Sequence, residues 1–473
     1  MKYGPDLPRD TRFIARVGRA FQVIGLGAVG AFLFSVALSL YMILPLANLT
    51  PQELYHEAWA QAQAHSYDPN AFKDWDKWEH KFDKEIKTQQ DAIDRVNELL
   101  KATGDHYAVF LDPTQAVHER NQMQGQFAGI GVELTPKLDD KGEVVFGSDK
   151  TKGPLMAADA DGFPTPGIIS GGPASQAGVL DGDAIVAIDG KSMKNATMED
   201  FYKAARGQSG SSITLTIKRG GKQFDLPFSR GIVKTKSVSS KMLTAPNGKR
   251  IGYIRLDSFI QQDTPQQMKA ALESLKDSDK LILDLRYNPG GDVQVCVQLM
   301  SMFIEKGVLV SLRERQAGAG HIVQTYAVDG NKVTLNSKLE GTNEEDNRAF
   351  PRPPALGLGK DIVVLVNGKS ASAAEMFTGA LKDHNRAVVV GERTFGKGIG
   401  QVVMPMANGT VMHVTSLRYF TPNGTWLGDG GNGKEQFGVE PHHTVKFDEN
   451  PKAKLGDIAR DNQLLFAVDL LSK

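Results

Sequence analysis

A long uncharged segment near the N-terminus constrains this chain more than any other feature of its sequence. The 33 residues between Arg19 and Glu53 carry no charged side chain and are rich in Leu, Val, Ala and Phe. A membrane-spanning helix needs about 20 apolar residues, so residues 20–44 are enough to cross a bilayer with some tilt. Pro45 is expected to end or kink that helix. The segment therefore predicts a helical membrane anchor.

The charges on either side of the segment set its expected orientation. Five basic and two acidic residues precede it, whereas the first Lys or Arg after it is Lys73. The positive-inside rule then places the N-terminus in the cytoplasm and the rest of the chain in the periplasm or an equivalent lumen. A cleaved signal peptide is the alternative, but its apolar region typically runs about 7–15 residues, and no clean A-x-A site stands near the end of this segment. We therefore expect an uncleaved single-pass anchor in the inner (cytoplasmic) membrane.

Composition argues against several classes of function. The chain has 55 Lys and Arg against 55 Asp and Glu, and this zero balance argues against a nucleic-acid binder that works by bulk positive charge. Its single cysteine, Cys296, excludes an internal disulfide and a Cys-based zinc site. His56-Glu57 does not begin an HExxH motif, because Ala60 stands where the second ligand would be. We therefore expect no metal and no other cofactor.

The pattern of the remaining chain predicts a multi-domain α/β protein. Capping signals at Thr50-Pro51 and Thr88 predict two helices, and from about Gly125 short β-like runs are broken by glycines. From Arg250 onward strands and helices alternate, which is typical of an α/β domain with a largely parallel sheet. The charged and then proline-rich stretch Glu340–Gly359 is expected to be a surface loop.

The expected elements can be placed on the sequence. The predicted strands are Ile168-Ile169, Ala184–Ile188, Ile213–Ile217, Ile251–Leu256, Leu281–Leu285, Ile362–Val366 and Ala387–Val390. The predicted helices of the same region are Met198–Ala205, one capped by Thr264-Pro265, and Val293–Phe303.

Two turns that follow predicted strands could carry chemistry. In Asn288-Pro289-Gly290-Gly291 the free backbone N–H groups of a helix start could hold an anion or a developing oxyanion, although an ordinary strand-to-helix turn explains the same residues. The segment Asn367–Glu375 surrounds its serines with small residues, which would let a substrate backbone approach. An N-cap serine is the alternative there, because serine is a preferred residue at that position of a helix. A serine hydroxyl also needs a base before it can act as a nucleophile.

A third segment supplies a candidate base. Lys397 stands between Gly396 and Gly398, next to Phe395 and after a predicted buried strand. Complete burial can lower a lysine pKa by as much as 3–5 units, and the resulting neutral amine can take a serine proton. A glycine loop that carries a surface lysine is the alternative.

Together these segments resemble the C-terminal processing peptidases, the tail-specific serine proteases with a Ser-Lys dyad. The resemblance covers nearly the whole chain after the apolar segment. In that family the catalytic serine lies in Ser-Ala-Ser-Ala-x-Glu, and the lysine lies 25 positions later in Thr-Phe-Gly-Lys-Gly. This spacing from Lys397 selects Ser372 over Ser370. The family also has a glutamine four positions after the lysine, to orient it, and Gln401 stands there.

The resemblance implies further roles near this dyad. The Gly290-Gly291 turn and the N–H of Ala373 would form the oxyanion hole, and which of the two glycines donates is left open. One departure lies outside the dyad: the family's Gly-x-x-Pro-Asp pattern ends here in Pro441-His442. Any salt bridge that the family builds from this aspartate is therefore in doubt.

The middle of the chain resembles a PDZ domain. Gly129, Ile130, Gly131 and Val132 match its carboxylate-binding loop, whose N–H groups would hold a C-terminal carboxylate while the peptide adds to the sheet edge as a strand. Arg206 matches a family position whose arginine helps to link the PDZ module to the active form, and an exposed arginine at a helix end is the alternative. Further matches are Gly172-Pro173-Ala174, Ala177-Gly178, Gly182-Asp183 and Ile188-Asp189-Gly190.

These observations predict a serine endopeptidase that recognises protein C-terminal tails through a PDZ domain and cleaves them with a Ser-Lys dyad. The alternatives are a non-catalytic PDZ scaffold with an inactive peptidase domain and a crotonase-like acyl-CoA enzyme. Expected partners are proteins with exposed C-terminal tails and the membrane, but not nucleic acid; an adaptor or a homo-oligomer is left open. The expected parts are a cytoplasmic basic stub (1–19), a transmembrane anchor (20–48), an N-terminal helical segment (49–118), a PDZ domain (119–232) and a serine peptidase domain (233–473) whose core resembles the crotonase/tail-specific protease fold.

Overall fold

The computed structural model describes the chain from Asn48 to Lys473, with some gaps. The gaps are residues 71, 124–125, 133–162, 165–167, 170, 181, 195, 235, 246, 279, 319, 432–436 and 449–454. The predicted anchor therefore lies, apart from Asn48, outside the described residues. Within the described ranges, no helix has the length and apolar character needed to cross a membrane.

The N-terminal part consists of helices packed around an apolar core. Helices α3 (Pro51–His65) and α5 (Gln89–Ala102) begin at the predicted caps, with Thr50 and Thr88 each completing a capping box. The short helix α4 (Trp75–Glu79) lies between them along the chain. The predicted helix starts in this part are therefore confirmed.

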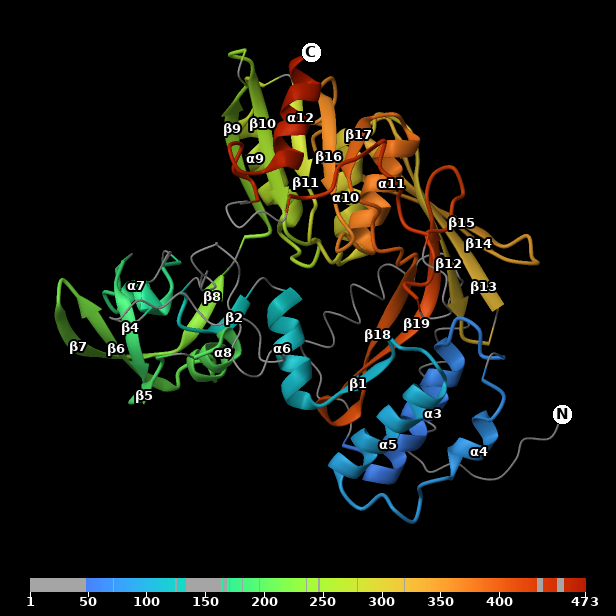
Figure 1. Cartoon of the computed structure of the whole chain (residues 1–473). Helices are drawn as coiled ribbons and strands as arrows, with labels where there is room; N and C mark the ends of the chain where they lie inside the picture. Colours follow the sequence, from blue (N-terminus) through green and yellow to red (C-terminus); the bar gives the residue numbers. More distant parts are fainter. Residues whose placement is uncertain are drawn as a thin grey trace.

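This helical part packs directly on a sheet of the C-terminal part. Strand β1 (Val109–Leu111) pairs antiparallel with β19 (Val411–Phe420). Phe110 of β1 shares one buried cluster with Leu99 of α5 and Met412 of β19. Figure 1 shows β18 and β19 reaching from the C-terminal part to the blue N-terminal helices. The N-terminal segment is thus in a position to contribute residues to sites on that sheet.

The middle part is a small β domain (green in Figure 1). A five-stranded sheet has the order β3-β4-β6-β7 with β5 paired to β4, and β2 pairs with β8. Of the predicted strand Ile168-Ile169, Ile168 forms an isolated antiparallel bridge with Val132, and Ile169 N–H donates to Gly131 O at 3.0 Å as part of that pairing; residues 165–167, 170 and 133–162, which flank the bridge, lie outside the described ranges. The elements are β2 (Gln126–Gly129), β3 (Phe163–Pro164), α7 (Pro173–Gln176), β4 (Ala184–Ile188), β5 (Lys191–Ser192), α8 (Met198–Ala205), β6 (Ser212–Arg219), β7 (Lys222–Ser229) and β8 (Gly231–Lys234).

The C-terminal part contains the predicted parallel sheet. Its strand order is β20-β17-β16-β11-β10-β9, and all neighbours are parallel except β9 and β10. One helix cap differs from the prediction: Asp263 is the N-cap of α9, and Thr264 is its buried first residue. The elements are β9 (Val238–Thr244), β10 (Arg250–Leu256), α9 (Thr264–Ser274), β11 (Lys280–Asp284), α10 (Val293–Phe303), β16 (Asp361–Val366), α11 (Ala373–Asp383), β17 (Ala387–Gly391), β20 (His443–Thr444) and α12 (Asn462–Ser472).

A second sheet of this part was not predicted. Seven antiparallel strands have the order β1-β19-β12-β13-β14-β15, with β18 also paired to β19. The predicted loop Glu340–Gly359 is wrong over Glu345–Pro351, which forms the edge strand β15. Most side chains of β15 are exposed, so its sequence carries the polar signature of a loop. The remaining strands are β12 (Gly307–Gln316), β13 (Gly320–Asp329), β14 (Lys332–Leu339) and β18 (Ile399–Pro405).

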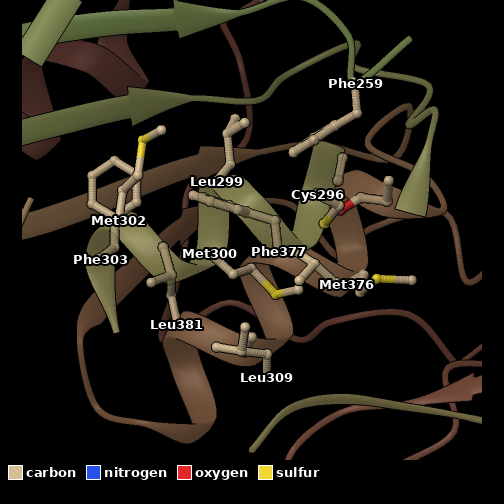
Figure 2. Close-up of a cluster of buried hydrophobic side chains, with 14 of the residues drawn as sticks. Phe259, Cys296, Leu299, Met300, Met302, Phe303, Leu309, Met376, Phe377 and Leu381 are labelled. Carbon is tan, nitrogen blue, oxygen red and sulfur yellow. The ribbon is translucent and has the colours of Figure 1, made fainter. Parts of the chain in front are cut away.

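The core beneath α11 fixes the position of its first turn. Figure 2 shows Phe377 of α11 among side chains of α10, and its ring lies 5.7 Å from that of Phe303 and 5.8 Å from that of Phe259. The buried Cys296 thiol donates a hydrogen bond of 3.3 Å to Ala373 O. The start of α11 is therefore held from below by close packing.

Candidate active site

Ser372 occupies the sharp turn between β16 and α11. It is the N-cap of α11, with φ of +54° and ψ of −119°, a conformation that L-residues with a side chain rarely adopt. Its N–H donates to Glu375 Oε2 at 2.9 Å. Backbone strain of this kind is commonly found at functional sites, where the surrounding structure holds it in place.

The neighbouring serine has a structural role. Ser370 is fully buried, and its hydroxyl donates to Leu285 O at 2.8 Å while accepting from Asn367 N–H at 3.0 Å. Ser372, by contrast, is only half-buried. Of the two serines, Ser372 is therefore the more accessible.

Glu375 joins the serine turn to the lysine loop. Its buried carboxylate accepts from the N–H groups of Ser372, Gly396 and Lys397 at 2.9, 2.6 and 2.8 Å, and from the Thr394 hydroxyl at 2.5 Å. Burial raises the pKa of Glu375, while these hydrogen bonds oppose the shift. Sequence reasoning gave Glu375 no role, although its place in the serine motif was the available signal.

Tyr419 makes a second connection between the same two segments. Its buried hydroxyl lies 2.5 Å from Lys397 O and 3.0 Å from Ser372 O, and its single hydrogen is shared between these two carbonyl acceptors. Burial raises the pKa of Tyr419 well above its usual value. The phenol therefore stays protonated and keeps both carbonyls in one place.

Lys397 lies in a half-buried position with a perturbed pKa. Burial lowers its pKa, and the nearby carboxylates of Asp105 and Glu375 oppose the shift. Its Nζ lies 4.0 Å from the centroid of the Tyr107 ring. Within the described ranges, Lys397 Nζ forms no hydrogen bond, so Ser372 and Lys397 share one site without a direct bond between their side chains.

Gln401 does not contact Lys397 through a hydrogen bond in this arrangement. Its Nε2 donates instead to the backbone carbonyl of Tyr107 at 2.5 Å. Tyr107 therefore lies against both Lys397 and Gln401, and sequence reasoning missed it. Its position far from the motifs in sequence left no local signal.

The predicted glycine turn packs directly against Ser372. Gly290 and Gly291 have φ of +97° and +148°, and a Cβ on Gly290 would lie 2.8 Å from Ala373 N. A Cβ on Gly291 would lie 2.3 Å from the Phe259 carbonyl carbon, so both positions require glycine. Gly290 N–H donates to Asn288 Oδ1 at 2.9 Å, whereas the N–H groups of Gly291 and Ala373 donate to no residue that the structure describes.

A buried ion network supports this turn. Arg286, which is 1% exposed, donates to the carboxylates of Asp284 and Asp461 at 2.6–2.9 Å and to Gln463 Oε1 at 2.9 Å. Asp461 also caps α12, so the network ties the end of β11 to the C-terminal helix. Hydrogen bonds from Arg286 to both carboxylates raise its pKa against the opposing effect of burial.

The predicted peptide-binding loop connects β2 to the core of the small β domain. Gly129 pairs with Gly231 across the β2–β8 ladder, and the Ile130 side chain is buried. Ile130 O accepts from Ala174 N–H at 2.8 Å, and Gly131 has φ of +77°. The loop is thereby pinned at its carbonyl groups, and Val132 is its last described residue.

Arg206 lies at the C-terminal end of α8. It is exposed, and its guanidinium carbon lies 4.9 Å from the Tyr202 ring centroid. The buried arginine of this region is Arg230, which donates to the carbonyls of Ala204 and Ala205. A role for Arg206 in linking the PDZ and peptidase parts stays a prediction.

One cluster of side chains has the residue types of a metal site. His56, His80 and Asp83 form a group whose candidate ligand atoms lie within 4.8 Å, but the two imidazoles already hydrogen-bond to the carboxylate at 2.7 and 3.0 Å. These residues belong to the N-terminal helical part, not to the site of Ser372.

His442 Nδ1 accepts from Val389 N–H at 2.9 Å, so the imidazole supports β17 where the family has an aspartate.

Comparison with known proteins agrees with this geometry. Residues 250–445 match the model of Peptidase family S41, and residues 166–219 match that of a PDZ domain. The chain is 32% identical to a carboxy-terminal-processing protease of Bartonella bacilliformis, over 72% of this chain and 68% of that protein. It is also 32% identical to a probable CtpA-like serine protease of Staphylococcus aureus strain N315, over 76% of this chain and 60% of that protein.

A solved structure gives the same result. The photosystem II D1 C-terminal processing protease superposes with a TM-score of 0.50 at 25% identity, over 87% of this chain and 96% of that one. The comparisons favour neither the inactive scaffold nor the acyl-CoA enzyme. The chain therefore belongs to peptidase family S41, whose carboxy-terminal-processing proteases are serine-type hydrolases, and it carries a PDZ domain.

Proposed function

We propose that Ser372 is the nucleophile of this C-terminal processing peptidase and that Lys397 is its general base. The observation that carries the proposal is the shared carboxylate of Glu375, which binds the backbone N–H groups of both residues. Ser372 stands at a strained helix start. Burial lowers the pKa of Lys397, which favours the neutral amine that a general base requires.

The chemistry follows from these groups. Neutral Lys397 takes the proton of the Ser372 hydroxyl as the serine oxygen attacks the scissile carbonyl, and the ammonium later returns a proton to the leaving amine. Gln401 orients the amine once its own amide leaves the Tyr107 carbonyl. For this step Lys397 Nζ moves from the Tyr107 ring to the serine hydroxyl.

The oxyanion hole is assigned to Gly291 and Ala373. Their N–H groups are without a hydrogen bond among the described residues, whereas Gly290 N–H is already bonded to Asn288 Oδ1. Loss of one oxyanion donor typically costs about 3–4 kcal/mol of transition-state stabilisation. This choice between the two glycines is one that the sequence left open.

The PDZ domain is proposed to capture the C-terminal tail of a protein substrate. The N–H groups of the loop at Gly129–Val132 would hold the terminal carboxylate, and the tail would add as a strand to the sheet edge. Support comes from the pinned loop geometry and from the family match over residues 166–219.

A matched pair of substrates tests this function. One reporter protein would end in a flexible apolar tail with a free carboxylate, and its partner would carry the same tail with an amidated end. We expect the purified chain to shorten the first reporter much faster, and we expect Ser372→Ala to stop the cleavage, as followed by intact-mass spectrometry. Equal cleavage of both reporters would contradict tail capture, and cleavage by Ser372→Ala would contradict the nucleophile.

We further propose that residues 20–44 anchor the chain in the inner membrane, with the peptidase in the periplasm or an equivalent lumen. The charge asymmetry around the uncharged segment supports this topology. Extraction of membranes at alkaline pH should leave the full chain in the pellet, and protease added outside spheroplasts should reach its C-terminal part. Release into the alkaline supernatant would contradict the anchor.

A further inference from the structure

Tyr107 reaches the active site from the N-terminal helical part. It lies between α5 and β1, in a segment that Asp105 fastens to the sheet: the Asp105 carboxylate accepts from Thr415 N–H and from the Thr415 hydroxyl, both at 3.0 Å. Tyr107 N–H donates to Asp105 Oδ1 at 3.0 Å. The position of Tyr107 is therefore fixed by contacts with the peptidase part.

Three separate atoms or groups of Tyr107 contact the site. Its ring faces Lys397 Nζ at 4.0 Å, its carbonyl accepts from Gln401 Nε2 at 2.5 Å, and its hydroxyl donates to Gly430 O at 2.9 Å. Lys397 and Gln401 are the two residues that must cooperate in proton transfer. Both are engaged by the same tyrosine.

These contacts favour the resting form of the base. An ammonium above an aromatic face is attracted by the ring quadrupole, whereas a neutral amine gains much less from the same contact. The ring therefore stabilises protonated Lys397, which cannot accept the serine proton. The carbonyl of Tyr107 also occupies the Gln401 amide, which then cannot orient the lysine.

We propose that Tyr107 is a positioning residue of this active site, whose ring holds the Lys397 ammonium and whose carbonyl holds the Gln401 amide. Through this tyrosine the N-terminal helical part favours the protonated form of Lys397 and so affects its readiness to serve Ser372. This inference rests on the proposed role of Lys397 as the base.

The other charged groups around Lys397 act together with the ring. Asp105 precedes Tyr107 in the same segment, Glu375 approaches from α11, and Asp429 faces Lys397 across an isolated backbone bridge. The first two raise the pKa of Lys397 against the effect of burial. A test must therefore change the ring without changing these carboxylates.

The test reads the protonation of Lys397 in a protein that cannot turn over. Lysine labelled with ¹³C at Cε is titrated by NMR in the Ser372→Ala background, and Lys397→Met identifies the resonance. A cation–π contact of the usual strength predicts that Tyr107→Leu lowers the Lys397 pKa by about 0.4–1.5 units. Tyr107→Phe keeps the ring and should leave the pKa nearly unchanged.

Stepwise fluorination of a phenylalanine at position 107 covers the case in which Tyr107→Leu does not fold. Each fluorine weakens the quadrupole at nearly constant shape, so the Lys397 pKa should fall with each one. In the active protein the acid limb of kcat/KM should move to lower pH by the same amount.

The outcomes separate this inference from the proposed function. A Lys397 pKa that ignores both Tyr107→Leu and fluorination would overturn the role of the ring, and so would an equal shift in Tyr107→Phe. Full proteolysis by Lys397→Met would instead defeat the proposed base, whatever the NMR titration gives.

Discussion

Replacement of Glu375 by glutamine probes the connection between Ser372 and Lys397. The two carboxylate oxygens together accept three backbone N–H groups and one hydroxyl: Oε1 accepts from Thr394 and Gly396, and Oε2 accepts from Ser372 and Lys397. An amide has one acceptor oxygen. In either orientation of Glu375→Gln, therefore, the NH₂ group faces at least one backbone N–H, and that hydrogen bond is lost.

The size of the effect follows from that lost bond. A hydrogen bond to a charged group contributes about 1.5–3 kcal/mol. If this amount is lost from the alignment of the two loops, kcat/KM falls about 10- to 150-fold. The variant also removes a charge that raises the pKa of Lys397, so the acid limb of the pH profile should move to lower pH.

Peptide cleavage and thermal unfolding measured on the same samples separate these effects. Glu392→Gln, at a half-buried position just after β17, serves as the control and should leave kcat/KM unchanged. The reasoning is refuted if Glu375→Gln keeps kcat/KM within about threefold of wild type at an unchanged Tm, because the lost hydrogen bond would then be dispensable for both catalysis and stability.

Three further changes probe other parts of the site and its support. In Gly291→Ala the added Cβ would lie 2.3 Å from the Phe259 carbonyl carbon, so peptide cleavage should fall at least 100-fold, whereas Gly341→Ala, with a positive φ but open space around it, should cost only about 1 kcal/mol of stability in a melt and no activity. Arg286→Met removes the guanidinium that two buried carboxylates share, leaving Asp284 with only the longer contact to Arg255 at 3.8 Å, and should cost about 3–5 kcal/mol in denaturant unfolding. Arg460→Met at the more exposed pair with Asp457 should cost less than about 1 kcal/mol, and equal costs would contradict the network. Burial raises the pKa of Glu314 to about 7, above its value of 4.5 when unfolded. The stability that the protonated Glu314 side chain contributes to the folded state is therefore fully present below about pH 4.5 and is lost as the pH rises through 7. The Tm of wild type should therefore fall relative to that of Glu314→Gln between pH 5 and pH 8, and parallel curves would contradict this.

Local patterns in the sequence predicted a large share of the fold. Capping boxes at Thr50 and Thr88 gave two helix starts, and buried apolar runs gave the strands of the parallel sheet. Part of the antiparallel sheet was missed because β15 is exposed and polar, and because the pairing of β1 with β19 joins distant segments and leaves no periodic signal.

The candidate site, too, could be predicted only in part from the sequence. Motif spacing predicted that Ser372, Lys397 and the glycine turn belong to one site. Tyr107 could not be found in this way, because its contact with Gln401 joins residues 294 positions apart. Nor could the sequence choose between Gly290 and Gly291, because the choice depends on which N–H the Asn288 side chain already uses.

The central claim is that Ser372 and Lys397 together perform the cleavage. The most direct measurement is kcat/KM for one peptide substrate with wild type, Ser372→Ala, Lys397→Met and the exposed control Lys369→Met, each verified as folded by its melting curve. The account predicts that the first two variants lose cleavage while all proteins keep their fold and Lys369→Met stays at the wild-type rate. Near-full activity of a folded Ser372→Ala or Lys397→Met variant would contradict it.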